Sequence, residues 1–237
     1  MSLTTLDDNM NVLLDLDGTL IDPKPGFVAS INHALTSLGW DALPEAEVAS
    51  HIGPPLEQII VALIGPGRAD QVASAVGLYR ERYSAHGIFE CSVYDGVPDM
   101  LQRICRAGFR LFLATSKPRT FAVRILGHFE LTPLFSGVYG SELDGRNADK
   151  RHLLGHLLSQ ERIEPNSATM VGDRAQDIAA AKANSLRSVG VLWGYGSRRE
   201  LESAGADAII ATPPQLEQDL SSTLKFHFGE ARNETVC

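Results

Sequence analysis

Two carboxylates and a glycine follow directly after a short apolar stretch near the N-terminus. The apolar residues 12–14 lead into Asp15, Leu16, Asp17 and Gly18. In an extended strand, side chains two residues apart share a face, so Asp15 and Asp17 can converge unless a turn beginning at Asp17 separates them. An isolated Asp-Gly pair is ordinarily a turn or a helix cap. The whole pattern Asp-x-Asp-Gly-Thr favours instead a strand whose C-terminal edge holds a cation and an anionic ligand, because open parallel sheets place their sites there.

A second polar group follows a later apolar stretch. Thr115 and Ser116 come directly after the apolar residues 111–114, and Pro118 lies two residues further on. Pro118 suits the first turn of a helix, so Thr115 and Ser116 are expected at a helix N-terminus, whose free N–H groups can hold an anion. Simple capping is the alternative, because Ser and Thr are strongly preferred as helix caps.

Two cations open a further predicted helix. Asp149 is followed by Lys150 and Arg151, and the helical pattern begins at Lys150. A cation in the first turn of a helix is unfavourable by ~0.3–1 kcal/mol because of the helix dipole. Lys150 and Arg151 therefore indicate either full solvation or an anionic partner, and a broken local rule of this kind is a hint of function.

A third apolar stretch also ends in acidic residues. Residues 168–171 lead into Gly172 and Asp173, and Asp177 follows four residues later in the first turn of a predicted helix. As helix caps these acids would be ordinary. Together with Asp15 and Asp17 they would form an oxygen-rich cluster, which suits Mg²⁺, a hard cation that takes carboxylates, waters and substrate phosphate oxygens.

Alternating strands and helices are expected to bring these residues together. From residue 91 onward, strand patterns alternate with helical patterns, which predicts right-handed crossovers and a parallel sheet covered on both faces. The fold class is therefore α/β, with a three-layer Rossmann-like core. The expected strands after the first are residues 110–115, 136–141, 168–172, 188–192 and 208–211, and the expected helices are 100–107, 118–127, 150–159, 175–183 and 197–204.

An all-helical insert interrupts this alternation after the first strand. Residues 23–90 contain three helical patterns, beginning near Phe27, Leu56 and Ala69, without a convincing strand between them. Two prolines at its start favour a hinge. The domain prediction is thus a core of residues 1–22 plus 91–224, a helical insert of residues 23–90, and a disordered tail of residues 225–237.

Composition limits the partners of the chain. The 237 residues carry 21 lysines and arginines against 29 acids, a net charge of −8, which argues against nucleic acid or an anionic membrane surface as the main partner. Three cysteines without a C-x-x-C spacing argue against disulfides or a zinc site. The polar, acidic residues 1–11 do not look like a signal peptide, and no stretch reaches the roughly 18 apolar residues of a membrane span, so a cytoplasmic protein is expected.

One glycine-rich motif is not interpreted as a nucleotide site. Gly194-Tyr195-Gly196 lies between a predicted strand and a predicted helix, as in dinucleotide-binding proteins. Arg199 occupies the third glycine position, however, and no suitable acid follows about 20 residues later. Ser197 and Glu200 are better explained as a capping box.

The acidic and polar strand ends, taken in order, resemble the four motifs of the haloacid dehalogenase superfamily in its phosphatase branch. The first motif is Asp15-Leu16-Asp17-Gly18-Thr19, the second is Thr115, the third is Lys150, and the fourth is Gly172-Asp173 with Asp177. The insert resembles the helical cap domain of the phosphoglycolate-phosphatase type. The runs 115–118, 139–145, 172–174 and 190–197 also look like a subgroup often labelled 5′-nucleotidase-like.

The resemblance implies a role for each of these residues. Asp15 would attack phosphorus and form an aspartyl-phosphate, and Asp17 would serve as the general acid and then the general base. Thr115, Ser116 and Lys150 would bind the phosphoryl oxygens of the substrate. The implied cofactor is Mg²⁺, held by Asp15, the backbone carbonyl of Asp17, Asp173, and Asp177 as a ligand or in the second shell.

Several alternatives remain open at this point. The substrate would be a small phosphate ester, either a nucleoside 5′-monophosphate or phosphoglycolate, and a sugar phosphomutase is a less favoured enzyme. A signalling receiver domain also combines acids, a Thr or Ser and a Lys, but it phosphorylates an Asp on a later strand, and no Asp ends a strand before Thr115 here. A dehalogenase lacks the second acid, whereas Asp17 is present. The oligomeric state is left open.

Overall fold

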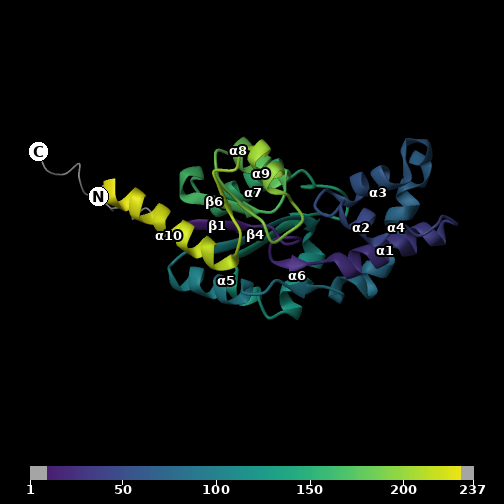
Figure 1. Ribbon diagram of the computed structural model, residues 1–237, viewed down its shortest axis with the longest axis horizontal. Coiled ribbons are helices and arrows are strands. Elements are labelled where there is room, and N and C mark those ends of the chain that lie inside the picture. The colour runs from purple at the N-terminus through teal and green to yellow at the C-terminus, as the bar shows by residue number, and fades with distance from the viewer. Residues whose placement is uncertain (1–9, 231–237) are drawn as a thin grey trace, which may run out of the picture.

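A six-stranded parallel sheet forms the centre of the molecule (Figure 1). The computed structural model describes residues 10–230, of which residues 66 and 223–230 are described by their backbone alone. The strand order is β5-β4-β1-β6-β7-β8, and each neighbouring pair is parallel. The predicted α/β class is confirmed. The strands are β1 (Asn11–Leu14), β4 (Arg110–Pro118), β5 (Gly137–Ser141), β6 (Ala168–Gly172), β7 (Arg187–Val191) and β8 (Ala208–Ile210).

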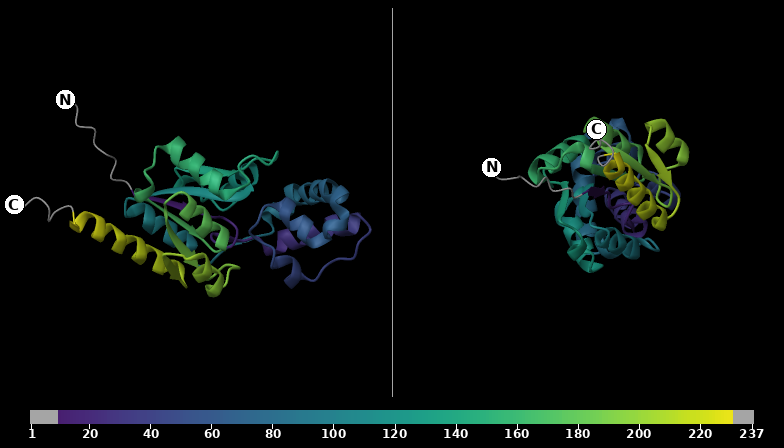
Figure 2. Two further views of the ribbon diagram at one scale, coloured as in Figure 1. Left: turned by 90° about the horizontal axis from the view of Figure 1, so that it is seen from above. Right: turned by 90° about the vertical axis from the view of Figure 1, so that its left-hand side faces the viewer.

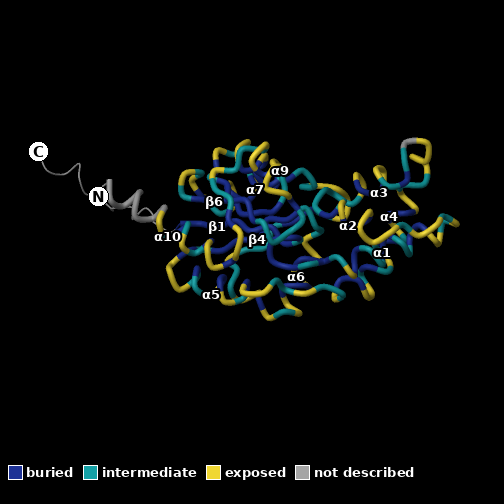
Figure 3. Tube along the Cα trace, viewed as in Figure 1, coloured by how far each residue is buried: buried dark blue, intermediate teal, exposed yellow. Residues whose placement is uncertain are grey.

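Helices cover both faces of this sheet. Alternate residues of β1 point to opposite faces, so Leu13 packs in one apolar cluster while Val12 and Leu14 pack in the other. Because both faces are covered, the central strands β1, β6 and β7 are among the most deeply buried parts of the chain (Figure 3). The cluster around Leu13 includes α7 (Lys150–Glu161) and α8 (Ala175–Ala183), with α9 (Arg198–Ala204) beside α8, and the other cluster includes α5 (Val97–Arg106), α6 (Arg119–His128) and α10 (Pro213–Glu230).

The insert after the first strand forms a separate helical body beside one end of the sheet (Figure 2). A two-stranded antiparallel ribbon of β2 (Ile21–Asp22) and β3 (Ser92–Val93) joins it to the sheet. Its first helix begins at Lys24, earlier than the expected Phe27, because proline is tolerated in a first helical turn and Asp22 accepts a hydrogen bond from the Lys24 N–H. The helices are α1 (Lys24–Ser37), α2 (Glu45–Ala49), α3 (Leu56–Ile64) and α4 (Val72–Ala85), with short 3₁₀ turns at Pro66–Gln71 and Gly87–Phe89.

The prediction that Pro118 starts a helix is wrong. Strand β4 extends to Pro118 with an irregular register after Thr115, and α6 begins at Arg119. The reason is local, because the Thr115 side chain accepts a hydrogen bond from the Lys117 N–H and the Ser116 carbonyl accepts one from Ser141. These bonds accompany the irregular end of β4, and no side chain caps α6, so Thr115 and Ser116 are not capping residues of that helix.

Helix α10 was not expected, and it extends into the segment predicted to be a disordered tail. Its backbone is helical as far as Glu230, while residues 231–237 lie outside the described part. Leu216 and Leu220 of α10 are buried, and Asp219 pairs with Arg187 through two contacts of 2.8 Å. Between residues 10 and 230, no helix is both long and apolar enough to cross a membrane.

If α10 belongs to the core, then Leu216→Ala should lower the free energy of unfolding by ~2–5 kcal/mol, because it leaves a cavity in a packed interior. Leu216 is 0 % exposed. Chemical denaturation monitored by circular dichroism would measure the change. Val123→Ala is the matched control, since Val123 lies on a helix but is 40 % exposed, and it should change stability by no more than about 0.5 kcal/mol. Equal effects from the two variants would contradict this placement of α10.

Candidate active site

The carboxyl ends of β1, β4 and β6 bring the predicted site residues to one edge of the sheet. Asp15 follows β1, Thr115 lies near the end of β4, and Asp173 follows β6. Strand β1 pairs with both of the other strands, so the three side chains approach from neighbouring strands. Lys150 and Asp177 reach the same edge from the first turns of α7 and α8. All five residues are buried.

Lys150 connects two of these carboxylates. Its Nζ lies 2.8 Å from Asp15 Oδ1 and 2.5 Å from Asp177 Oδ1. Burial alone would lower the pKa of Lys150, but the two carboxylates outweigh it and raise that pKa above its ordinary value. Lys150 is therefore an ammonium cation in a buried position. Of the two explanations that the sequence left open for this helix-opening cation, full solvation or an anionic partner, the structure shows the second for Lys150, and the partners are Asp15 and Asp177.

Asp177 is fixed by hydrogen bonds to both of its oxygens. Oδ1 accepts from Lys150, and Oδ2 accepts from the Arg174 N–H at 3.0 Å, as part of a capping box at the start of α8. Burial raises the pKa of Asp177, and Lys150 opposes that rise. In this geometry Asp177 positions Lys150, and each of its oxygens keeps a further lone pair that could bind a metal ion.

Asp173 has the features of a metal ligand. It is 0 % exposed, Oδ2 accepts from the Tyr195 N–H at 2.8 Å, and Oδ1 is buried without a hydrogen-bond partner among the described residues. Burial, followed by the charges of Asp177 and Asp15, raises the pKa of Asp173 to about 8. A cation would supply both the missing partner and the missing counter-charge.

The donor atoms around Asp173 fit a hard cation. Asp15, Asp173 and Asp177 each offer one carboxylate oxygen, and these atoms lie within 4.8 Å of one another. They are all oxygens, which suit Mg²⁺ better than metals that prefer nitrogen or sulfur. These three side chains can therefore hold one divalent cation next to Asp15.

The glycines around Tyr195 allow the chain to pass close to Asp173. A Cβ on Gly194 would lie 2.1 Å from the Gly18 carbonyl oxygen, and a Cβ on Gly196 would lie 1.7 Å from the Asp173 carbonyl oxygen. Neither position can carry a side chain without a shift of the backbone. The Gly194-Tyr195-Gly196 motif thus has a structural role at this site that the sequence reasoning did not identify.

Asp17 has a lysine partner that was not predicted as a site residue. Lys117 Nζ lies 2.5 Å from Asp17 Oδ1, and the Lys117 side chain is only 7 % exposed. Burial raises the pKa of Asp17, and the Lys117 charge and hydrogen bond lower it in part. The sequence signal was available, because Lys117 directly follows Thr115 and Ser116 at a strand end. A buried lysine there requires an anion nearby.

A cavity lies over Asp15 and Asp17, between the sheet edge and the helical body. Thr115 and Ser116 line it on the core side, and residues of α1, α3 and α4 line it on the other. Ser116 also borders a second hollow beside Lys150. The predicted site residues Thr115 and Ser116 therefore line the same cavity as Asp15 and Asp17.

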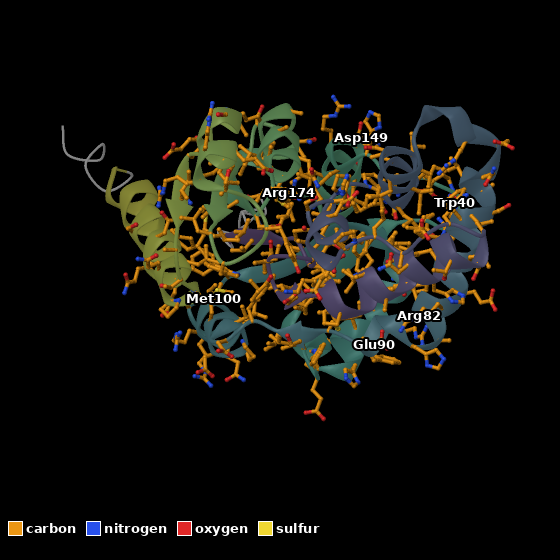
Figure 4. The ribbon with its side chains drawn as sticks, turned by 45° about the vertical axis from the view of Figure 1, so that its right-hand side comes forward. Trp40, Arg82, Glu90, Met100, Asp149 and Arg174 are labelled. Atoms are coloured by element: carbon orange, nitrogen blue, oxygen red, sulfur yellow. The ribbon has the colours of Figure 1, made fainter. Side chains whose placement is uncertain are left out.

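Three arginines hold the helical body against the core. Arg174, near the middle of the view in Figure 4, donates to the Ile52 carbonyl of the helical body. Arg80 of α4 donates to the Leu143 carbonyl at 3.0 Å, and Arg124 of α6 donates to the Ser84 carbonyl at 3.1 Å. In this arrangement the helical body covers the cavity above Asp15 and Asp17.

The fold and the buried acidic site together define a haloacid dehalogenase-like hydrolase. A model of that family matches residues 12–191, and the chain belongs to it. The match extends across the whole insert and five of the six strands of the sheet, namely β1, β4, β5, β6 and β7.

Relatives with known names are mostly phosphatases. The chain is 40% identical over 212 residues to a 5′-nucleotidase of Pseudomonas aeruginosa, covering 90% of this chain and 96% of that one. It is 40% identical to the tyrosine-protein kinase PtkA of Mycobacterium tuberculosis, covering 88% and 72%, and 31% identical to a phosphoglycolate phosphatase of Nitrosospira multiformis, covering 84% and 90%. A predicted phosphatase from Clostridium acetobutylicum has a similar structure, with a TM-score of 0.86, 34% identity and coverage of 90% and 99%. The chain is a phosphatase of this family.

Gly196→Ala should lower phosphatase activity by more than tenfold, because the added Cβ must displace the backbone that holds Asp173 in place. A small misplacement of a catalytic geometry is enough for a loss of this size. Phosphate release measured at saturating substrate would show it. Gly127→Ala on α6 is the matched control, since its Cβ would meet nothing within 4 Å, and it should keep full activity. Full activity in Gly196→Ala would show that the close approach has no functional importance.

Proposed function

We propose that this phosphatase is a Mg²⁺-dependent phosphomonoesterase that works through an aspartyl-phosphate on Asp15. The observation that carries the proposal is the pairing of two acids with two lysines, of which Asp15 and Lys150 are buried and Asp17 and Lys117 are mostly buried. Asp15 lies 2.8 Å from Lys150, and Asp17 lies 2.5 Å from Lys117, both beside one cavity. Asp15 is thus available as a nucleophile and Asp17 as a proton carrier, which are the two roles that two-step phosphoryl transfer requires.

In the first step a carboxylate oxygen of Asp15 forms a bond to phosphorus as the bond from phosphorus to the ester oxygen breaks. Asp17 donates its proton to the departing alkoxide. Lys150, Thr115 and Ser116 hold the phosphoryl oxygens, and the Lys150 charge offsets the repulsion between Asp15 and the phosphoryl group. When bound by Asp15, Asp173 and the Asp17 carbonyl, with Asp177 as a possible further ligand, Mg²⁺ supplies additional neutralisation of that repulsion.

In the second step water replaces Asp15 on phosphorus. Asp17, now a carboxylate, takes a proton from the attacking water, and the bond between Asp15 and phosphorus breaks to release inorganic phosphate. Burial favours the protonated form of Asp17, and Lys117 favours the ionised form. Asp17 is therefore suited to exchange a proton in both directions.

The cavity favours a nucleoside 5′-monophosphate over phosphoglycolate. Its wall on the side of the helical body is mainly apolar and aromatic, and the cations among its described lining residues are Arg80 and Lys117. Arg80 is paired with Glu57 at 2.8 Å and Lys117 with Asp17, so neither is free to neutralise the carboxylate of phosphoglycolate. The 40% identity to a 5′-nucleotidase supports the same choice. Phosphoglycolate phosphatase is the alternative, supported by a relative at 31% identity.

Phosphate release from a panel of esters tests both the chemistry and the substrate class. Nucleoside 5′-monophosphates and phosphoglycolate are each incubated with Mg²⁺ and with EDTA. Phosphate release is expected with Mg²⁺, and added Mg²⁺ should restore it after EDTA treatment. With EDTA a loss of more than about 90 % is expected, because the buried carboxylates then repel the phosphoryl group. A bound metal ion supplies on the order of several kcal/mol of charge stabilisation in such reactions. Undiminished phosphate release in EDTA would contradict the proposed dependence on Mg²⁺. A stable phosphoprotein without phosphate release would favour a signalling role instead.

Asp15→Asn and Asp17→Asn should separate the two roles. Asp15→Asn is expected to abolish turnover, since an amide is a poor nucleophile, and Asp17→Asn is expected to lower kcat by ~10²–10⁴-fold, the usual scale of general acid–base catalysis. Rapid-quench trapping of phosphoprotein would show a covalent species in the Asp17→Asn variant and none in Asp15→Asn. A near wild-type rate in Asp15→Asn would eliminate the covalent mechanism, and a negligible loss in Asp17→Asn would place the proton transfer on another group.

A further inference from the structure

Two polar groups on α4 are buried beside the cavity without a hydrogen-bond partner. They are the Tyr83 hydroxyl and the Arg80 Nε–H, and both residues line the cavity above Asp15 and Asp17. Tyr83 is 1 % exposed, so its hydroxyl is shielded from bulk water. Residues three apart on a helix are neighbours, so the two groups share one face of α4. In the part of the chain between residues 10 and 230, few buried side-chain donors are left unpaired in this way.

An unpaired buried donor normally has a functional explanation. It forfeits its bonds to water without gaining a protein partner, which is unfavourable for folding. Phenylalanine would fill nearly the same volume at position 83 without that penalty. The Tyr83 ring is buried, but its hydroxyl forms no hydrogen bond with any of the described residues. The hydroxyl is therefore a candidate for contact with a ligand.

Aromatic rings around Tyr83 form a continuous apolar wall. The Tyr79 and Tyr83 rings stack with centroids 5.2 Å apart and an angle of 11° between their planes. Phe27 contacts Tyr79 edge-on at 5.9 Å, and Phe121 contacts Tyr83 edge-on at 5.5 Å. All four residues line the cavity. Such a wall suits a leaving group that has a flat ring.

Tyr83 also lies close to the predicted general acid. Lys117 Nζ, which pairs with Asp17, is 5.2 Å from the centre of the Tyr83 ring. Burial and the nearby Asp17 charge raise the pKa of Tyr83, so its hydroxyl keeps its proton and can donate a hydrogen bond. Tyr83 thus lies next to the ion pair that contains the proposed general acid.

We propose that Tyr83, assisted by the Arg80 Nε–H, forms a subsite that binds uncharged oxygen atoms of a ring-bearing leaving alcohol, such as a nucleoside. This inference rests on the proposed function, because the leaving alcohol exists only if the chain cleaves a phosphate ester. A neutral hydroxyl donor suits an uncharged oxygen. A buried carboxylate at the same place would need a counter-charge, and Asp17 would repel it.

The test compares Tyr83→Phe with the wild-type enzyme on two esters. Uridine 5′-monophosphate offers a ring with hydroxyl and carbonyl oxygens, whereas phenyl phosphate offers a ring alone. Loss of one hydrogen bond should lower kcat/KM for uridine 5′-monophosphate by ~3–10-fold relative to phenyl phosphate. The melting temperature should be unchanged or higher, because a buried unpaired hydroxyl is removed. Arg80→Lys, which keeps the charge but removes the Nε–H, should shift the same ratio in the same direction.

Tyr139→Phe is the matched control. Tyr139 donates to Glu161 at 2.6 Å, lies outside this cavity, and should leave the ratio of the two kcat/KM values unchanged. Equal losses on both esters in Tyr83→Phe, no loss on either, or a lower melting temperature would overturn the subsite and assign the hydroxyl a structural role.

Binding of uridine alone separates failure of the subsite from failure of the proposed function. Calorimetry with uridine needs no turnover, and Tyr83→Phe should weaken its binding ~3–10-fold. If the wild-type enzyme releases no phosphate from any ester, the proposed function fails, and uridine binding still decides the subsite. Absence of uridine binding to the wild-type protein, or equal affinity in both proteins, would overturn the subsite even if the enzyme hydrolyses other esters.

Discussion

The Lys150 ammonium is the interaction on which the rest of the site depends. Asp15 and Asp177 are both buried, and two carboxylates at that depth could not remain ionised without a cation between them. Two helix starts are arranged around this contact. Asp149 caps α7, which places Lys150 in its first turn, and the capping box of α8 aims Asp177 at the lysine. Asp15 is thereby held beside the Lys150 charge, at the wall of the cavity.

A single loop joins the metal side of the site to the base of the helical body. The Tyr195 N–H donates to Asp173, and the Tyr195 hydroxyl donates to Asp22 of β2, where the helical body begins. In the same loop, Trp193 donates to the Thr19 carbonyl at 2.9 Å. The position of Asp173 and the path of the chain into the helical body are therefore fixed by residues of the same loop.

The sequence predicted the sheet and most of the site because both follow from local patterns. Apolar runs ending in Asp15, Asp173 and Thr115 identify strand ends, and parallel pairing brings those ends together. Three features depend on long-range contacts and were missed. The partner of Lys117 is 100 residues away, the glycines near Tyr195 matter only against Gly18 and Asp173, and α10 has a weak apolar pattern whose burial depends on packing against α5.

Strand β1 lies at the centre of the sheet although it is made first. Its partners are β4, which pairs Arg110 with Asn11, and β6, which pairs Ala168 with Asn11. While the ribosome is still extending the chain, β1 therefore emerges with neither neighbour available, and the nascent protein must keep this apolar segment from aggregating until residues 168–172 leave the exit tunnel. Asp15 acquires its lysine only late in translation. A truncated product that stops before β6 would thus lack activity altogether, and would also expose the unpaired edge of β1.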